Sequence, residues 1–169
     1  MKEQVTAMSI EFNVDEVLAV AEQIERNGDR FYRLAAERQL NSQAARILVG
    51  LADMEQGHLK TFSEMRASLS EAERKPVTFD PYDESALYLN AMADRNVFDV
   101  TRDPTEKLAG ADVSEVLRLG IEVEKDSIVF YVGLKELVPE RLGRERIDAI
   151  TKEELNHFAK LSEMLADLD

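Results

Sequence analysis

The feature that most constrains this chain is an internal duplication with an offset of 99 residues. Without gaps, residues 14–65 superpose on residues 113–164. The matched pairs include Val14/Val113, Leu18/Leu117, Phe31/Phe130, Tyr32/Tyr131 and Ser63-Glu64-Met65/Ser162-Glu163-Met164. A duplicated segment of this kind is one supersecondary unit used twice, which buries its apolar face against its copy. The duplication therefore predicts two equivalent halves around a shared core.

Apolar residues recur at three- and four-residue steps in both halves, which predicts an all-α chain. Asn13 with Glu16, and Asp112 with Glu115, are typical of capped helix starts. We expect helices over about 14–40 and 113–134, a second helix capped by Asn41 or Ser42, and a fourth after Pro139. Because the connection near Asn41 is short, each half should be an antiparallel helix pair.

The duplication also sets the organisation of the predicted single domain, residues 1–169. We expect an N-terminal arm (1–12), a first helix pair (14–69), a crossover (70–112) and a second pair (113–167). The crossover has no counterpart in the repeat and contains Pro76, Pro81 and Pro104. It should hold short helices over about 83–94 and 103–110. A connection this long can return along the bundle, so helices two and three should be parallel in a four-helix bundle.

Composition excludes several classes of protein. The chain has no cysteine, which rules out disulfides, iron–sulfur clusters and zinc ribbons and is compatible with a reducing compartment. A net charge of −13 should repel nucleic acid and anionic lipid. The sequence has no apolar run long enough to span a membrane and no apolar signal-peptide core. We therefore expect a cytoplasmic protein with no nucleic-acid or membrane partner.

Each half carries a Glu-x-x-His motif, and thirty residues before each motif stands another glutamate. Residues three apart share one helix face, so each motif directs a carboxylate and an imidazole to one point. Four carboxylates on apolar stripes repel one another unless cations are present, and two divalent ions balance their charge. This oxygen-rich, thiolate-free set suits iron or manganese, while zinc can substitute. The predicted metal ligands are Glu25, Glu55, His58, Glu124, Glu154 and His157.

Two tyrosines follow the upstream glutamates by two helical turns. Tyr32 and Tyr131 can reach back toward the metals and hydrogen-bond a ligating carboxylate, or they can be core residues only. Small residues flank the same glutamates and should leave room for ions and a small substrate. These small residues are Ala21, Gly28, Gly120 and Ser127.

The pattern resembles the rubrerythrin branch of the ferritin-like di-iron carboxylate superfamily over about residues 14–66 and 113–166. The resemblance rests on Glu25 with Phe31-Tyr32 and Glu55-x-x-His58, and on the same residues 99 positions later. It implies a ferritin-like bundle that holds two iron ions. The chain departs from rubrerythrins in lacking the cysteines of a rubredoxin-like domain. It also has Ser127 where the family has an extra glutamate, which leaves the symmetric ligand set typical of ferroxidase-like sites.

Three functions remain open at this point. The first is an oxidoreductase that reacts with O2 or H2O2, in which Glu55 and Glu154 bridge two irons and a separate donor supplies electrons. The second is a non-catalytic bundle for iron binding, storage or sensing, and the third is a structural bundle with a metal staple. Apolar residues in the crossover favour a homodimer, or else cover one face of the bundle. These are Tyr82, Leu87, Tyr88, Leu89, Met92 and Phe98.

Overall fold

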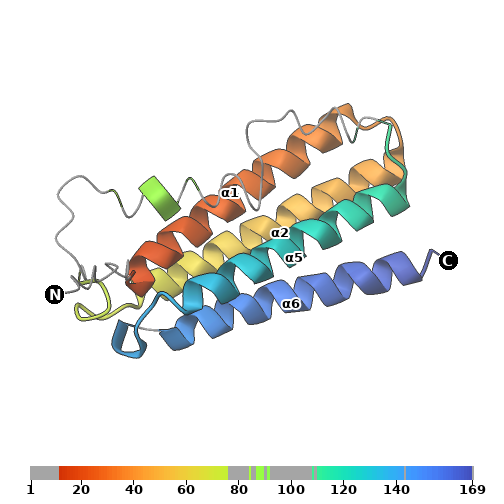
Figure 1. The fold of residues 1–169 in the computed structure, drawn as a ribbon. Helices are drawn as coiled ribbons and strands as arrows, with labels where there is room; N and C mark the ends of the chain where they lie inside the picture. Colours follow the sequence, from red (N-terminus) through yellow and green to blue (C-terminus); the bar gives the residue numbers. More distant parts are fainter. Residues whose placement is uncertain are drawn as a thin grey trace, which may run out of the picture.

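A computed structural model of the protein describes residues 12–75, 84, 87–89, 91, 108, 110–142 and 144–168. The elements are α1 (Val14–Arg38), α2 (Ser42–Ala67), α5 (Val113–Lys135), the 3-10 turn η1 (Glu140–Leu142) and α6 (Arg144–Ala166) (Figure 1). No strand occurs among the described residues, so the prediction of an all-α chain is confirmed.

The predicted helix starts are confirmed by side-chain capping. The side chain of Asn13 accepts a hydrogen bond from the N–H of Glu16 at 2.9 Å, and the Glu16 carboxylate accepts one from the N–H of Asn13 at 2.8 Å. Asp112 and Glu115 form the same reciprocal pair at the start of α5. At α2 the cap is Asn41, whose side chain accepts from two backbone N–H groups. These contacts satisfy helix donors that have no partner within the helix.

The four long helices form two antiparallel pairs, as expected. Figure 1 shows α2 returning along α1 and α6 returning along α5, while α2 and α5 run in the same direction. The helices α1 and α2 pack against each other, as do α5 and α6, and α2 also contacts α5. The chain between α2 and α5 must therefore travel the length of the bundle. The predicted four-helix bundle with a crossover is confirmed.

Only part of the crossover is described. Residues 84, 87–89, 91 and 108 are helical, while the limits of both short helices, together with Tyr82, Met92 and Phe98, lie outside the described residues. Leu89 and Leu108 are buried, whereas Leu87 and Tyr88 are exposed. Near the end of the crossover, the side-chain amide of Gln39 donates to the carbonyls of Leu108 at 2.6 Å and Ala111 at 2.9 Å.

Of the predicted N-terminal arm, only Phe12 is described. Its side chain is buried, and its N–H donates to the carbonyl of Leu137, in the turn after α5, at 3.1 Å. This contact joins the start of the first helix pair to the middle of the second.

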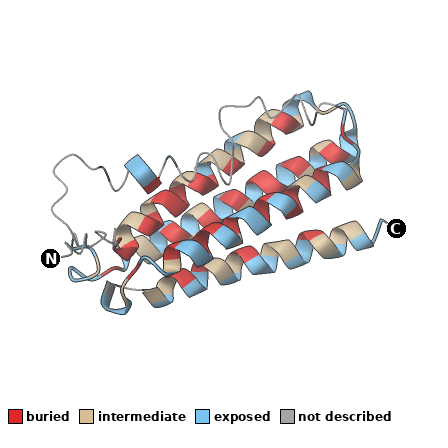
Figure 2. Ribbon diagram, viewed as in Figure 1, coloured by how far each residue is buried: buried red, intermediate tan, exposed pale blue. Residues whose placement is uncertain are grey.

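The core lies along the inward faces of the helices, and α6 is the least covered of the four (Figure 2). Its buried residues are Ile147, Ile150, Glu154 and Leu161, far fewer than α1 buries. None of the helices in the described part of the chain combines the length and apolar character needed to cross a membrane.

Candidate metal centre

Four glutamates, one from each long helix, lie inside the apolar core. Their relative exposures are 1% for Glu25, 5% for Glu55, 3% for Glu124 and 2% for Glu154. They are buried because each occupies a position on the apolar stripe of its own helix. Burial of an ionised carboxylate without a compensating partner is costly, so four of them together require protons or cations.

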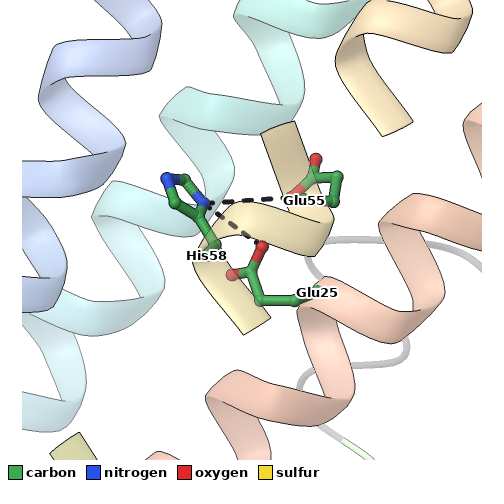
Figure 3. A group of neighbouring side chains, drawn as sticks. All are labelled: Glu25, Glu55 and His58. Atoms are coloured by element: carbon green, nitrogen blue, oxygen red, sulfur yellow. Dashed lines mark hydrogen bonds and ion pairs between the residues drawn. The ribbon is translucent and has the colours of Figure 1, made fainter. Parts of the chain in front are cut away.

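The first half of the centre is compact. Nδ1 of His58 lies 3.3 Å from Glu25 Oε2 and 4.0 Å from Glu55 Oε2. Figure 3 shows the three side chains pointing toward one another from α1 and α2. One ligand atom from each residue lies within 4.8 Å of the others, the geometry of a group that can hold a metal ion.

The second half joins the same cluster through two contacts with His58, and within that half His157 lies beside Glu124. Glu154 Oε1 lies 3.7 Å from His58 Nδ1, and His157 Nδ1 lies 3.7 Å from Glu124 Oε1. The imidazole rings of His58 and His157 stack with centroids 3.8 Å apart. All six predicted ligands are therefore brought together between the two helix pairs. The second half is more open, because the His157 side chain is 16% exposed and that of His58 is 4% exposed.

Several polar atoms in this cluster have no hydrogen-bond partner within the described part of the chain. They are His58 Nε2, His157 Nδ1 and Glu154 Oε1, all buried. Buried polar atoms are nearly always hydrogen-bonded, so exceptions need a reason. A carboxylate oxygen and an imidazole nitrogen are both ordinary ligands of iron, manganese and zinc. The donor set therefore fits a pair of metal ions.

The electrostatics of the carboxylates agree with this fit. Burial raises the pKa of Glu55 well above its usual value, and the charge and hydrogen bonding of Glu25 raise it further. Burial also raises the pKa of Glu154, and the charges of Glu25 and Glu124 add to the shift. The raised pKa values mean that the four carboxylates are unfavourable when all are ionised together. Either bound protons or bound cations can relieve this repulsion.

The same negative charge also raises the pKa of His58, although burial acts on it in the opposite direction. Burial lowers its pKa, but the hydrogen bond to Glu25 and the charges of Glu25 and Glu124 outweigh burial, and the pKa is raised overall. A cation bound at this point would take the place of the imidazole proton, since a metal-bound histidine is neutral.

Both predicted tyrosines are fully buried within the field of the four glutamates. Burial is the main reason that the pKa of each phenol is raised well above its usual value. The leading charge effect comes from Glu55 for Tyr32 and from Glu25 for Tyr131. Both phenols are thus neutral at physiological pH. The hydroxyl of Tyr131 has no hydrogen-bond partner among the described residues, so its expected bond to a carboxylate is not formed here.

Phe62 is a neighbour of the centre that the sequence motifs do not identify. Its ring stacks on that of His58, with centroids 5.5 Å apart, and meets Tyr131 edge-on at 6.4 Å. The signal for this role was its position, one helical turn after His58. In the second half of the repeat the equivalent residue is Leu161, so the two imidazoles have different neighbours.

Packing corrects the expectation for Gly120 and shows where a further glutamate, Glu22, lies. The space beside Gly120 is not open, because a Cβ there would lie 3.1 Å from Leu161 and 3.5 Å from Leu51. Gly120 thus allows close approach of helices rather than leaving room for a substrate. Glu22 is turned toward Arg26 at 3.6 Å and Arg66 at 3.5 Å, and so belongs to a peripheral ion-pair group.

The chain is similar to a crystal structure from Thermotoga maritima that is described as a candidate ferritin-like diiron-carboxylate protein. The two have 27% sequence identity and a TM-score of 0.58, over 94% of this chain and 98% of the other. No protein-family model and no curated protein matches the sequence. The similarity, together with the helix order described above, confirms the prediction of a ferritin-like fold.

Proposed function

We propose that the protein is a di-iron carboxylate oxidoreductase of the rubrerythrin or ferroxidase type, without a rubredoxin domain. The observation that carries the proposal is the connected cluster of four buried glutamates and two histidines, one carboxylate from each helix. Two divalent ions would neutralise four carboxylates that otherwise repel one another in an apolar core. The description of the Thermotoga maritima protein supports the same metal pair.

Distances suggest how the ligands divide between the two ions. Glu25 is the carboxylate nearest to His58 Nδ1, at 3.3 Å, and Glu124 is the carboxylate beside His157 Nδ1, at 3.7 Å. We assign one such pair to each ion as terminal ligands. Glu55 and Glu154 would help to hold the ions, since both lie within 4.0 Å of His58 Nδ1 although they come from different halves. Iron is the expected metal, while manganese and zinc accept the same donors.

Bound ferrous ions would supply one electron each to O2 or H2O2. The protein's own residues bury the four carboxylates, hold them on separate helices and keep the buried phenols of Tyr32 and Tyr131 protonated. Phe62 fixes the plane of the His58 ring by stacking on it. Re-reduction would need a separate donor, because the chain has no cysteine with which to build a rubredoxin-like site.

The proposal is tested by loading metal-free protein anaerobically with ferrous ion and mixing it with O2 or H2O2 in a stopped-flow instrument. We expect two irons per chain, one rapid turnover and slow steady-state turnover until a donor is added. Oxidation no faster than that of free ferrous ion in the same buffer would overturn the enzymatic function. If two irons still bound, the protein would instead be a non-catalytic iron-binding bundle.

A further inference from the structure

An apolar groove opens between α2, α5 and α6 at the end of the bundle where α6 finishes. Its volume is about 550 Å³, within the range of small-molecule sites. The apolar part of its lining includes Ile47, Leu51 and Met54 of α2, Leu161 and Met164 of α6, and Leu168 just after α6. We propose that this groove binds a single-chain amphipathic carboxylate, with the alkyl chain in the groove and the carboxylate at its cationic edge.

The apolar character of the groove is not a by-product of the duplication. The repeat equivalents of Ile47 and Met54 are Arg146 and Glu153. At that opposite end Arg146 is held by Glu73, at 2.7 Å, and Leu69 is buried. The segment after α2 thus contributes a buried leucine and an ion pair at one end of the bundle. At the other end, the equivalent residues Ile47 and Met54 line the apolar groove.

The edge of the groove supplies the charge complementarity that selects an anion. Arg46 from α2 and Lys160 from α6 both line it, and neither forms an ion pair with any residue that the structure describes. Asp167 also borders the groove, so the two cations outnumber the acid. In a chain with a net charge of −13, this pairing of two cations with an apolar hollow favours a negatively charged head group.

The size of the groove favours a small molecule over a protein partner. A stable protein interface of standard size uses about 800 Å² on each partner, usually as a broad patch. A concave apolar hollow with a few polar groups at its edge is instead the usual form of a ligand site.

The groove also lies next to the carboxylate–histidine cluster. Leu51 is one helical turn before Glu55, and Leu161 is one turn after His157. Both leucines also lie beside Gly120, where an added Cβ would be 3.1 Å from Leu161 and 3.5 Å from Leu51. Binding in the groove needs no metal, so it is testable whether or not the proposed iron chemistry is correct.

The test is calorimetric titration of the metal-free full chain with decanoate, decanol and decylamine below their micellar concentrations. We expect one decanoate per chain, weaker binding of decanol and the weakest binding of decylamine. The double variant Arg46→Gln, Lys160→Gln should bind decanoate about tenfold more weakly, with little change for decanol. Equal affinity for decanoate and decylamine, or no binding of either, would overturn the proposal.

A matched pair of glycine variants locates the binding site. Gly50 lines the groove and Gly133 lies on α5 away from it, and a Cβ at either position meets no atom within 4 Å. Gly50→Phe should reduce decanoate affinity at least about tenfold by filling the groove, while Gly133→Phe should leave it unchanged. Both replace a helical glycine with a better helix former, so both should fold. Equal decanoate affinity in the two variants would contradict this site. The proposal would also be wrong if the protein bound no decanoate and formed a dimer that Gly50→Phe, but not Gly133→Phe, dissociated. In that case the groove would be a contact surface between two copies of the chain.

Discussion

The imidazole rings of His58 and His157 are stacked, with centroids 3.8 Å apart and planes inclined by 15°, although the residues are 99 positions apart in the chain. Each ring also directs Nδ1 toward the glutamate from the partner helix of its own half, Glu25 or Glu124. The contact is therefore the point where the two copies of the repeat meet. Substitutions around it distinguish ligands from supporting residues.

Metal content should depend far more on Glu55 and Glu154 than on the phenols. Glu55→Ala or Glu154→Ala removes a negative charge and a ligand, so metal affinity should fall by well over about 100-fold. Tyr32→Phe removes only a hydroxyl group that can orient a ligand, and the fall should be no more than about tenfold. Elemental analysis after dialysis against buffered ferrous ion or Mn²⁺ measures the difference. Equal metal content in all three variants would contradict the ligand assignment.

The metal-free protein should lose stability as the pH rises. The folded pKa values of Glu55 and Glu154 lie above the unfolded value, which is about 4.3, so above that pH the folded state holds more protons. Linkage then makes the free energy of unfolding fall as pH rises through the folded pKa values. The raised pKa of His58 has the same sign and further lowers the free energy of unfolding as the pH rises.

Thermal unfolding of chelator-treated protein between about pH 5 and about pH 8 measures this slope. Glu154→Gln should flatten it, whereas Glu163→Gln, at an exposed position on the same helix, should not. Divalent metal at about 100 times its Kd should add about 2.7 kcal/mol of stability per ion. A wild-type slope in Glu154→Gln would show that the buried carboxylates do not control the pH dependence.

Two glycines in α5 should respond oppositely to the same substitution. Gly120→Leu forces a side chain against Leu51 and Leu161 and should destabilise the protein by about 1–3 kcal/mol. Gly133→Leu enters open space and should stabilise it by up to about 1 kcal/mol, because leucine has the higher helix propensity. Denaturant unfolding curves provide the measurement. If Gly120→Leu left the free energy of unfolding unchanged, the helices would be able to move apart at little cost.

The two capping boxes should differ in their contribution to stability. Asn13 is buried and its side-chain amide also donates to the carbonyl of Lys75 at 3.3 Å, whereas Asp112 is exposed. Asn13→Ala should therefore cost about 2 kcal/mol and Asp112→Ala about 1 kcal/mol. Chemical denaturation compares them, and a larger cost for Asp112→Ala would contradict the role of the Lys75 contact.

We also predict that the protein is a homodimer. Leu87 and Tyr88 of the crossover are 65% and 49% exposed, and exposed apolar residues in a connecting segment can mark a contact surface. The double variant Leu87→Glu, Tyr88→Glu should dissociate the dimer without loss of helicity. Light scattering at micromolar concentration measures the mass, and a monomeric wild-type protein would refute the prediction.

The sequence by itself determined the helices and their caps, and it predicted the six residues of the candidate centre. Helical periodicity places Glu25, Glu55, Glu124 and Glu154 on apolar stripes, and the length of the crossover allows the central helices to be parallel. These features follow from spacing along one helix or from chain length, which a linear sequence records directly. The duplication then indicates that both halves share one centre.

Tertiary packing decided what distinguishes the two halves. Phe62 stacks on His58, whereas its repeat equivalent, Leu161, fills the space beside Gly120 and lines the apolar groove. The stacking of His58 on His157 and the approach of Glu154 to His58 also join residues of separate helices. Contacts across helices depend on the rotation and separation of whole helices and on every side chain between them. Periodicity assigns a residue to an inward face but does not specify which atom of another helix it meets.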